Sequence, residues 1–103
     1  MTEQIRVRRY YADCETWGEK YQRAYGRYLS SSPEILMESL NRHFRARGAC
    51  VTARYVDFQA LLSVFEDLEF DLTEVLGDEG TVSLRTPFAL HERTLFRISE
   101  DEI

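Results

Sequence analysis

Three carboxylates stand at alternate positions in this sequence, at Asp67, Glu69 and Asp71. In an extended segment this spacing would align them on one face, where they could hold a divalent cation. A calcium or magnesium loop, however, needs more ligands and a shaping glycine that is missing here. We therefore interpret these carboxylates as a solvated acidic face, and we expect neither a bound metal nor a cofactor.

The other side chains that could catalyse a reaction are few and scattered. The two histidines, His43 and His91, belong to no metal-binding motif of the HExxH type. No serine or cysteine lies in a nucleophile-elbow pattern. Cys14 and Cys50 fit neither a CxxC nor a zinc pattern, so we expect two reduced thiols, with a disulfide as the alternative. We expect that the protein is not an enzyme.

Basic side chains gather at the end of the amphipathic stretch 32–48 and in the segment after it. Arginine can pair bidentately with phosphate, which suggests nucleic acid as one class of partner. Against this, the chain carries a net charge of −5, and a helix C-terminus disfavours anions. We therefore keep a nucleic-acid-binding regulator as the alternative function. Its candidate contacts are Arg42, Arg45, Arg47 and Arg54.

Tyrosines form a further candidate contact surface. Tyr21, Tyr25 and Tyr28 recur at helical spacing after Trp17, and six tyrosines are many for so small a domain. Each buried hydroxyl needs a hydrogen-bond partner, so we expect some rings, Tyr25 and Tyr28 among them, at a surface or a dimer seam. The alternative is that the rings pack in the core, which we favour for Trp17 and Tyr21.

Charge is divided unevenly along the chain. Residues 1–54 carry ten basic and six acidic side chains, a net charge of +4, whereas residues 55–103 carry three and twelve, a net charge of −9. Either the two halves face each other and partly neutralise, or the molecule presents one basic and one acidic surface that would steer charged partners. In the second case the candidate contact residues are Glu66, Asp67, Glu69, Asp71 and Glu74, with Tyr25 and Tyr28.

Apolar periodicity predicts three helices. The first covers residues 17–29, and the second follows a Ser32 cap and stops at Gly48. The short link between these two helices predicts that they pack as an antiparallel pair. A third helix, capped by Asp57, carries the apolar stripe that we place at the centre of the core. The stripe consists of Phe58, Leu61, Leu62, Phe65 and Leu68.

Alternation of apolar and polar residues predicts strands around these helices. The strands cover residues 4–9, 49–56, 81–85 and 94–98. We expect the last two to pair across a loop that holds His91, whereas segment 69–76 fits either a strand or a short helix. The predicted fold is α+β, with three helices packed on a small, mostly antiparallel sheet in the order β-α-α-β-α-(β/α)-β-β.

Length and composition indicate one domain, 1–103, in which residues 99–103 form a frayed acidic tail. No run reaches 18 apolar residues and the N-terminus lacks a signal-peptide core, so we expect a cytoplasmic protein without a membrane span.

These features favour a protein that acts by binding another protein. We expect a non-enzymatic interaction module, acting alone or as a homodimer, that contacts a basic partner through the acidic surface or the tyrosine-rich face. That partner could itself be a nucleic-acid-binding protein. Small phage-encoded inhibitors of host defence systems have this general build, which is an analogy of size and charge only.

Overall fold

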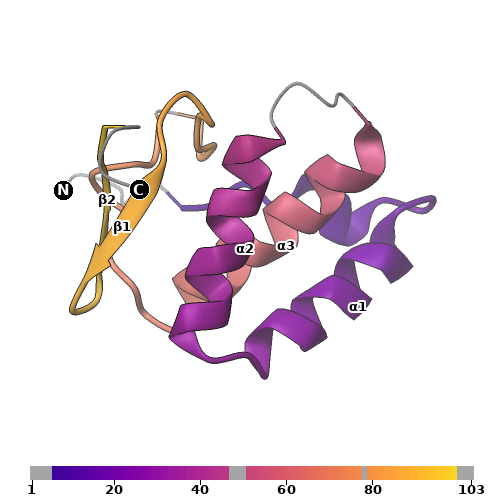
Figure 1. Ribbon diagram of the computed structural model, residues 1–103. Helices are drawn as coiled ribbons and strands as arrows, with labels where there is room; N and C mark the ends of the chain where they lie inside the picture. The colour runs from indigo at the N-terminus through magenta and orange to yellow at the C-terminus, as the bar shows by residue number, and fades with distance from the viewer. Residues whose placement is uncertain (1–5, 47–50, 78, 100–103) are drawn as a thin grey trace, which may run out of the picture.

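Three helices followed by a two-stranded antiparallel hairpin make up an α+β domain (Figure 1). The structure is a computed structural model and describes residues 6–46, 51–77 and 79–99. In chain order the elements are η1 (Tyr10–Asp13, a 3-10 turn), α1 (Gly18–Leu29), α2 (Pro33–Arg45), α3 (Thr52–Asp67), β1 (Phe88–His91) and β2 (Thr94–Arg97). None of the helices within these ranges is long and apolar enough to span a membrane.

α1 and α2 form where the sequence predicts them. The Ser32 hydroxyl accepts a hydrogen bond from the Ile35 N–H at 3.4 Å, and Pro33 occupies the first turn of α2. The predicted stop at Gly48 lies outside the described residues. The apolar face of α2 is buried, and its members, spaced by four residues, are Leu36, Leu40 and Phe44.

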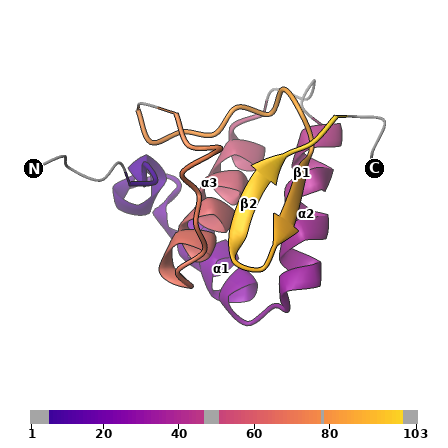
Figure 2. The ribbon, with the colours of Figure 1, turned by 90° about the vertical axis from the view of Figure 1, so that its left-hand side faces the viewer.

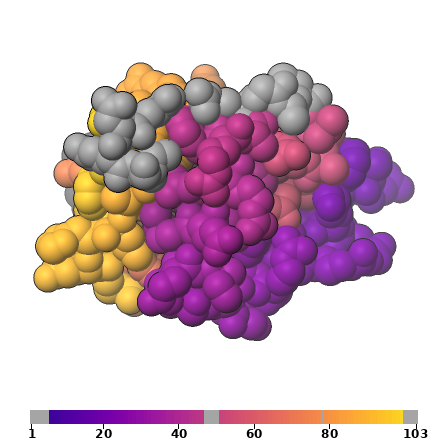
Figure 3. All heavy atoms as spheres, in the orientation of Figure 1, coloured from indigo at the N-terminus to yellow at the C-terminus, as the bar shows by residue number. Residues whose placement is uncertain are grey.

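α3 is the centre of the core, as predicted. α1 packs along one side of α3, whereas α2 and the hairpin lie on the other side (Figures 1 and 2). The first two helices therefore use α3 as a main partner, and they do not form the antiparallel pair expected from their short link. In the space-filling view, α2 covers the middle of the face that α1 and α2 share (Figure 3). The buried residues of α3 are Val56, Phe58, Ala60, Leu61, Leu62, Ser63, Val64 and Phe65.

The strand predicted over residues 49–56 is wrong where the structure describes it. α3 already begins at Thr52, and Asp57, the predicted cap, lies inside the helix. Val56 is fully buried in the core. Burying such a side chain stabilises the fold by about 1.5–3 kcal/mol, which exceeds the weak preference of valine and tyrosine for strands. Tertiary burial therefore decides the conformation of this segment.

The N-terminal strand predicted over residues 4–9 is not shown either. Val7 is buried and its two neighbours are exposed, as the alternation predicts. The backbone, however, finds other partners: the Val7 N–H donates to the Glu66 carboxylate at 2.6 Å, and the Arg8 N–H donates to the Gly80 carbonyl at 2.7 Å. This segment is therefore held by a side chain and a turn rather than by a sheet.

The hairpin forms later in the chain than predicted. β1 and β2 pair antiparallel through a two-residue turn, and His91 ends β1 instead of lying in a loop. Of the strand predicted over residues 81–85, the structure shows one antiparallel bridge, between Val82 and Leu76. The predicted element order is therefore corrected to three helices and then two strands.

Asn41 of α2 gives the physical reason for the position of β1. Its side-chain amide donates to the Phe88 carbonyl and accepts from the Phe88 N–H, both at 2.9 Å. The amide thus pairs with β1 as a neighbouring strand would. A side chain that lies 47 residues earlier in the sequence therefore decides which segment becomes the strand.

The segment 69–76, which fits either a strand or a helix, is irregular chain followed by one turn. The Asp71 N–H donates to the Arg93 carbonyl at 2.6 Å, and the Asp71 carbonyl accepts from the Leu95 N–H at 2.9 Å. A turn follows, closed by a hydrogen bond of 2.9 Å from the Leu76 N–H to the Leu72 carbonyl. The segment therefore covers the open edge of β2.

Candidate functional site

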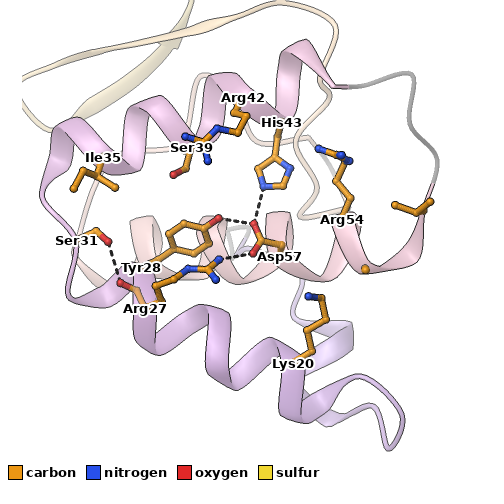
Figure 4. A pocket seen from close by; sticks show the side chains of 12 residues that line it. Lys20, Arg27, Tyr28, Ser31, Ile35, Ser39, Arg42, His43, Arg54 and Asp57 are labelled. Carbon is orange, nitrogen blue, oxygen red and sulfur yellow. Dashed lines mark hydrogen bonds and ion pairs between the residues drawn. The ribbon is translucent and has the colours of Figure 1, made fainter.

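A cleft of about 650 Å³ lies where the three helices come together (Figure 4). Four of its lining side chains are cations: Lys20 and Arg27 of α1, Arg42 of α2 and Arg54 of α3. Among the described residues, the lining contains one carboxylate, Asp57 of α3. The cleft is therefore a basic site on an acidic protein, and it exists only because the fold brings together residues that are far apart in sequence.

Asp57 stands at the centre of this site and joins all three helices. Its Oδ2 accepts hydrogen bonds from the Tyr28 hydroxyl and from His43 Nε2, the latter at 2.8 Å. Its Oδ1 accepts from Arg27 Nη2 at 2.7 Å. Because an ionised carboxylate only accepts hydrogen bonds, Nε2 of His43 carries a proton. One carboxylate of α3 thus ties down side chains of α1 and α2.

These donors also decide the charge of Asp57. Burial by itself would raise the pKa of Asp57, but hydrogen bonds from His43 and Tyr28 and the charge of Arg27 outweigh it and lower the pKa to about 2. Burial and the hydrogen bond to Asp57 raise the pKa of Tyr28 to about 12. Asp57 is therefore ionised at neutral pH, and its charge is compensated by its own partners.

The His43–Asp57 pair resembles part of a catalytic triad, but its surroundings indicate a structural role. The His43 side chain is only 8% exposed, and its ring packs edge-on against Phe58 with 5.3 Å between centroids. Within the described ranges, no hydroxyl or thiol hydrogen-bonds to its second nitrogen, Nδ1. A general base must reach the proton that it removes, and this arrangement offers none.

Two buried nitrogens at the site lack a hydrogen-bond partner in the part of the chain that the structure describes, His43 Nδ1 and Arg54 Nε. Figure 4 shows the imidazole between α2 and α3, with the Arg54 side chain beside it. Buried polar atoms are nearly always hydrogen-bonded, so an unpaired pair of them at the wall of a cleft marks a place where a ligand atom could bind.

α3 begins at this cleft. Its N-cap, Val51, offers no side-chain acceptor, and the first turn of α3 contains no acidic residue. A helix start carries partial positive charge and unpaired N–H groups, which favour anions. Arg54 therefore lies at a helix N-terminus. Among the described residues, the sequence-based objection that the arginines stand at a helix C-terminus applies to Arg42 and Arg45.

The predicted nucleic-acid contacts are divided by the fold. Arg42 and Arg54 line the cleft, whereas Arg45 is exposed on α2 and does not line it. Arg47 lies outside the described residues. Arg42 also pairs with Glu38, one turn earlier on α2, at 3.2 Å.

The predicted acidic surface is divided in the same way. Glu66 forms ion pairs with Arg6 at 3.0 Å and Arg9 at 2.7 Å, and Arg9 also pairs with Asp67 at 2.6 Å. The hydrogen bond from Arg9 lowers the pKa of Asp67. In this region the two halves of the chain neutralise each other. The predicted residues that remain exposed without an ion pair among the described residues are Glu69, Asp71 and Glu74.

Tyr25 and Tyr28, predicted at a surface, make their hydrogen bonds within the protein. Tyr28 is buried against Asp57, and the half-buried Tyr25 donates to Asp67 at 2.5 Å. Tyr21 is buried as favoured above, and its hydroxyl donates to Ser63 Oγ at 2.6 Å. Carboxylates and a serine of α3 therefore satisfy the hydroxyl groups that were expected to force some rings outward.

Sequence reasoning missed Lys20, Arg27 and the network around Asp57. These residues come from three helices, so no local spacing connects them. One signal was present: Asp57 is a carboxylate between Val56 and Phe58, in a helix that is otherwise rich in apolar residues. A charged side chain in such a segment is rarely buried unless it is paired.

No group of three or more His, Cys, Asp or Glu side chains in the described ranges could hold a metal ion. Cys14 is a free thiol, as predicted, and Cys50 lies outside the described residues.

No protein-family model, curated protein or solved structure matches this chain. The function is therefore inferred from the geometry of the cleft.

Proposed function

We propose that this protein is a non-enzymatic protein-binding module, and that the basic cleft receives an acidic segment of its partner. The observation that supports this proposal is the convergence of four cationic side chains on one cleft whose single carboxylate is already compensated. Opposite charge at such a cleft steers the partner and fixes its orientation. The expected partner segment is therefore rich in Asp and Glu.

Apolar residues at the cleft favour a peptide over a simple ion. Ile35 of α2 is 50% exposed and Val51 is 53% exposed, and both line the cleft. Large apolar side chains left exposed beside charged ones are typical of protein interfaces. We infer a partner segment in which apolar residues accompany the acidic ones.

The exposed part of the acidic surface offers a second contact region. Glu69, Asp71 and Glu74 can still meet a basic partner, as the sequence predicts, and Glu66 and Asp67 keep their role in ion pairs within the protein. A molecule with a basic cleft and an acidic region could also bind a second copy of itself head to tail. Sedimentation velocity across a concentration series tests that alternative, because self-association would increase the sedimentation coefficient with concentration.

Nucleic acid remains the second candidate, because two of the four predicted contacts, Arg42 and Arg54, do meet in the cleft. The aromatic residue of the cleft lining is Tyr28, which is buried with Arg27 over its ring at 4.8 Å. Single-stranded nucleic acid usually stacks its bases on exposed rings, and this ring has no free face for a base.

Fluorescence anisotropy with labelled probes tests the proposal directly. The probes are short peptides of alternating Glu and Leu, control peptides in which Lys replaces every Glu, and single- and double-stranded DNA. We expect the acidic peptides to bind, with an affinity that falls as salt is added. Preferential binding of DNA, with a steep salt dependence, would instead support the second candidate.

Substitution locates the binding site. Arg42→Gln and Arg54→Gln should each lower the affinity for the acidic peptide by about tenfold. This factor corresponds to the loss of a charge-assisted hydrogen bond. Arg45→Gln removes the same charge from the exposed face of the same helix as Arg42, and serves as the matched control. Equal losses of affinity in all three variants would mean that general electrostatic attraction holds the peptide, and not specific contacts in the cleft.

A further inference from the structure

We propose that the end of the cleft where α3 begins is a subsite for a phosphate monoester, so that the acidic segment of the partner carries a phosphorylated side chain. The proposal rests on the protein-binding function above and names the chemistry of its ligand. It starts from the four residues of this region that line the cleft, which are His43, Val51, Ala53 and Arg54.

The unpaired Arg54 Nε at this end indicates a missing acceptor. Arg54 Nε is shielded from solvent and has no hydrogen-bond acceptor within the described ranges. The Nε edge of a guanidinium presents two parallel N–H groups, which match two oxygens of one oxyanion. Beside it, the His43 ring is more than nine-tenths buried, with Nδ1 likewise unpaired. An oxyanion seated on Arg54 would give its Nε the acceptor that it lacks, whereas His43 Nδ1, with the ring proton on Nε2, is itself an acceptor and does not bind the oxyanion.

The start of α3 adds donors of a second kind. Val51 provides no side-chain cap, and the first turn contains no carboxylate that would compete with a ligand. Phosphate groups bind at helix starts because backbone N–H groups and the helix dipole both favour them. The helix start and Arg54 therefore attract an anion locally, whatever the overall charge of the protein.

Charge and donor number favour phosphate over a carboxylate. A phosphate monoester carries about −1.5 to −2 charges at pH 7 and three acceptor oxygens, whereas a carboxylate carries one charge and two oxygens. Lys20 of α1 and Arg54 of α3 line the cleft (Figure 4), whereas Arg27 is paired with Asp57 and Arg42 with Glu38. A doubly charged group balances these cations better than a single carboxylate does.

The first probe is inorganic phosphate. Its binding is measured by NMR on the ¹⁵N-labelled chain at constant ionic strength. We expect saturable shifts of the amide resonances of residues 52–54, with acetate binding at least about tenfold more weakly. Arg54→Gln should lower the affinity for phosphate by about tenfold, and Arg45→Gln should leave this affinity unchanged. If Arg54→Gln alters the melting curve, Arg54→Lys, which keeps the charge but lacks the two parallel N–H groups, replaces it in the comparison.

Peptides then identify the source of the phosphate. A Glu-rich peptide with one phosphoserine should bind at least about tenfold more tightly than the same peptide with serine, and more tightly than free phosphate. Tighter binding of free phosphate than of the phosphopeptide would assign the subsite to a small molecule and overturn the proposal. Tighter binding of an oligonucleotide would assign it to nucleic acid, with the same consequence.

The two proposals fail in different ways. If phosphate and acetate produce the same weak, unsaturable shifts, the subsite does not exist. The protein-binding function still stands in that case if unphosphorylated acidic peptides bind the cleft and lose affinity in Arg42→Gln. If neither phosphate nor any acidic peptide shifts the resonances of cleft residues, both proposals are wrong.

Discussion

Asp57 is a single carboxylate that accepts hydrogen bonds from Tyr28 and Arg27 of α1 and from His43 of α2. Its side chain is 19% exposed, so water competes weakly for these donors. Removing one partner of such a network leaves the others buried without an acceptor, which is more costly than losing one ordinary hydrogen bond. The wall of the cleft therefore depends on this residue.

At the residue scale, we expect Asp57→Asn to lower the free energy of unfolding at pH 7 by about 2 kcal/mol. The reason is that the pKa of Asp57 is about 2 in the folded protein and 3.8 ordinarily. Stability from a lowered carboxyl pKa is present above the ordinary value and is lost as pH falls through the folded value. The difference between the two proteins should therefore shrink between about pH 4 and pH 2.

Urea denaturation at several pH values measures this difference. Asp13→Asn, at an exposed position of η1, is the matched control and should leave the free energy of unfolding at pH 7 unchanged within about 0.5 kcal/mol. A deficit in Asp57→Asn that stays constant down to pH 2 would mean that the carboxyl shape, and not its charge, holds the helices.

At the element scale, two glycines have different roles, one in the turn that contacts the N-terminal segment and one inside α1. Gly80 has a φ of 76°, and a Cβ added there would lie 2.3 Å from the Arg6 carbonyl oxygen. The Gly80 carbonyl also accepts the hydrogen bond from Arg8. The close approach of the N-terminal segment therefore requires glycine. A Cβ added at Gly26, inside α1, would meet nothing within 4 Å, so this position has no such requirement.

The two glycines lead to opposite predictions for the same substitution. Gly80→Ala should destabilise the protein by roughly 1–3 kcal/mol, because alanine is strained at this φ and meets the backbone. Gly26→Ala should stabilise it by roughly 0.5–1 kcal/mol, because alanine is the better helix former. Thermal melts of both variants check this: a higher melting temperature for Gly80→Ala would contradict the contacts described for Gly80, and a lower one for Gly26→Ala would contradict the open space described for Gly26.

At the scale of the whole molecule, the fold sorts charges into three groups. Arg6 and Arg9 neutralise Glu66 and Asp67 at the end of α3. A second set of cations, from all three helices, remains around the cleft. The carboxylates after α3 stay exposed, so the molecule keeps an acidic region apart from its ion pairs. The two halves of the chain therefore neutralise each other at the end of α3, whereas basic and acidic side chains stay on separate surfaces elsewhere in the molecule.

Two double variants with equal charge changes separate these groups. Glu66→Gln with Asp67→Asn should destabilise the protein by roughly 1–3 kcal/mol, since hydrogen bonds to charged groups are lost. Glu69→Gln with Asp71→Asn should change stability by less than about 0.5 kcal/mol, because both side chains are exposed and asparagine keeps the acceptor for the Thr73 N–H. Equal effects in a urea titration would mean that total charge decides stability, and not the ion pairs.

The sequence by itself determined the elements whose causes are local. Ser32 and Pro33 predict the start of α2 because the cap and the fixed φ act within one turn. The amphipathic pattern of residues 32–48 predicts a buried face of α2, the tyrosine pattern places Tyr21 in the core, and the apolar stripe predicts that α3 is central. These predictions are confirmed because each depends on neighbours within a few residues.

Only the tertiary structure decided what depends on distant partners. Residues 52–56 are helical because Val56 is buried in the core, and β1 lies at Phe88 because Asn41 supplies its hydrogen bonds. The Val7 N–H finds a carboxylate instead of a strand for the same reason. The cleft depends on such partners entirely. Its cations come from three helices, and their approach follows from the packing of α1 and α2 on α3, which no spacing along the chain encodes.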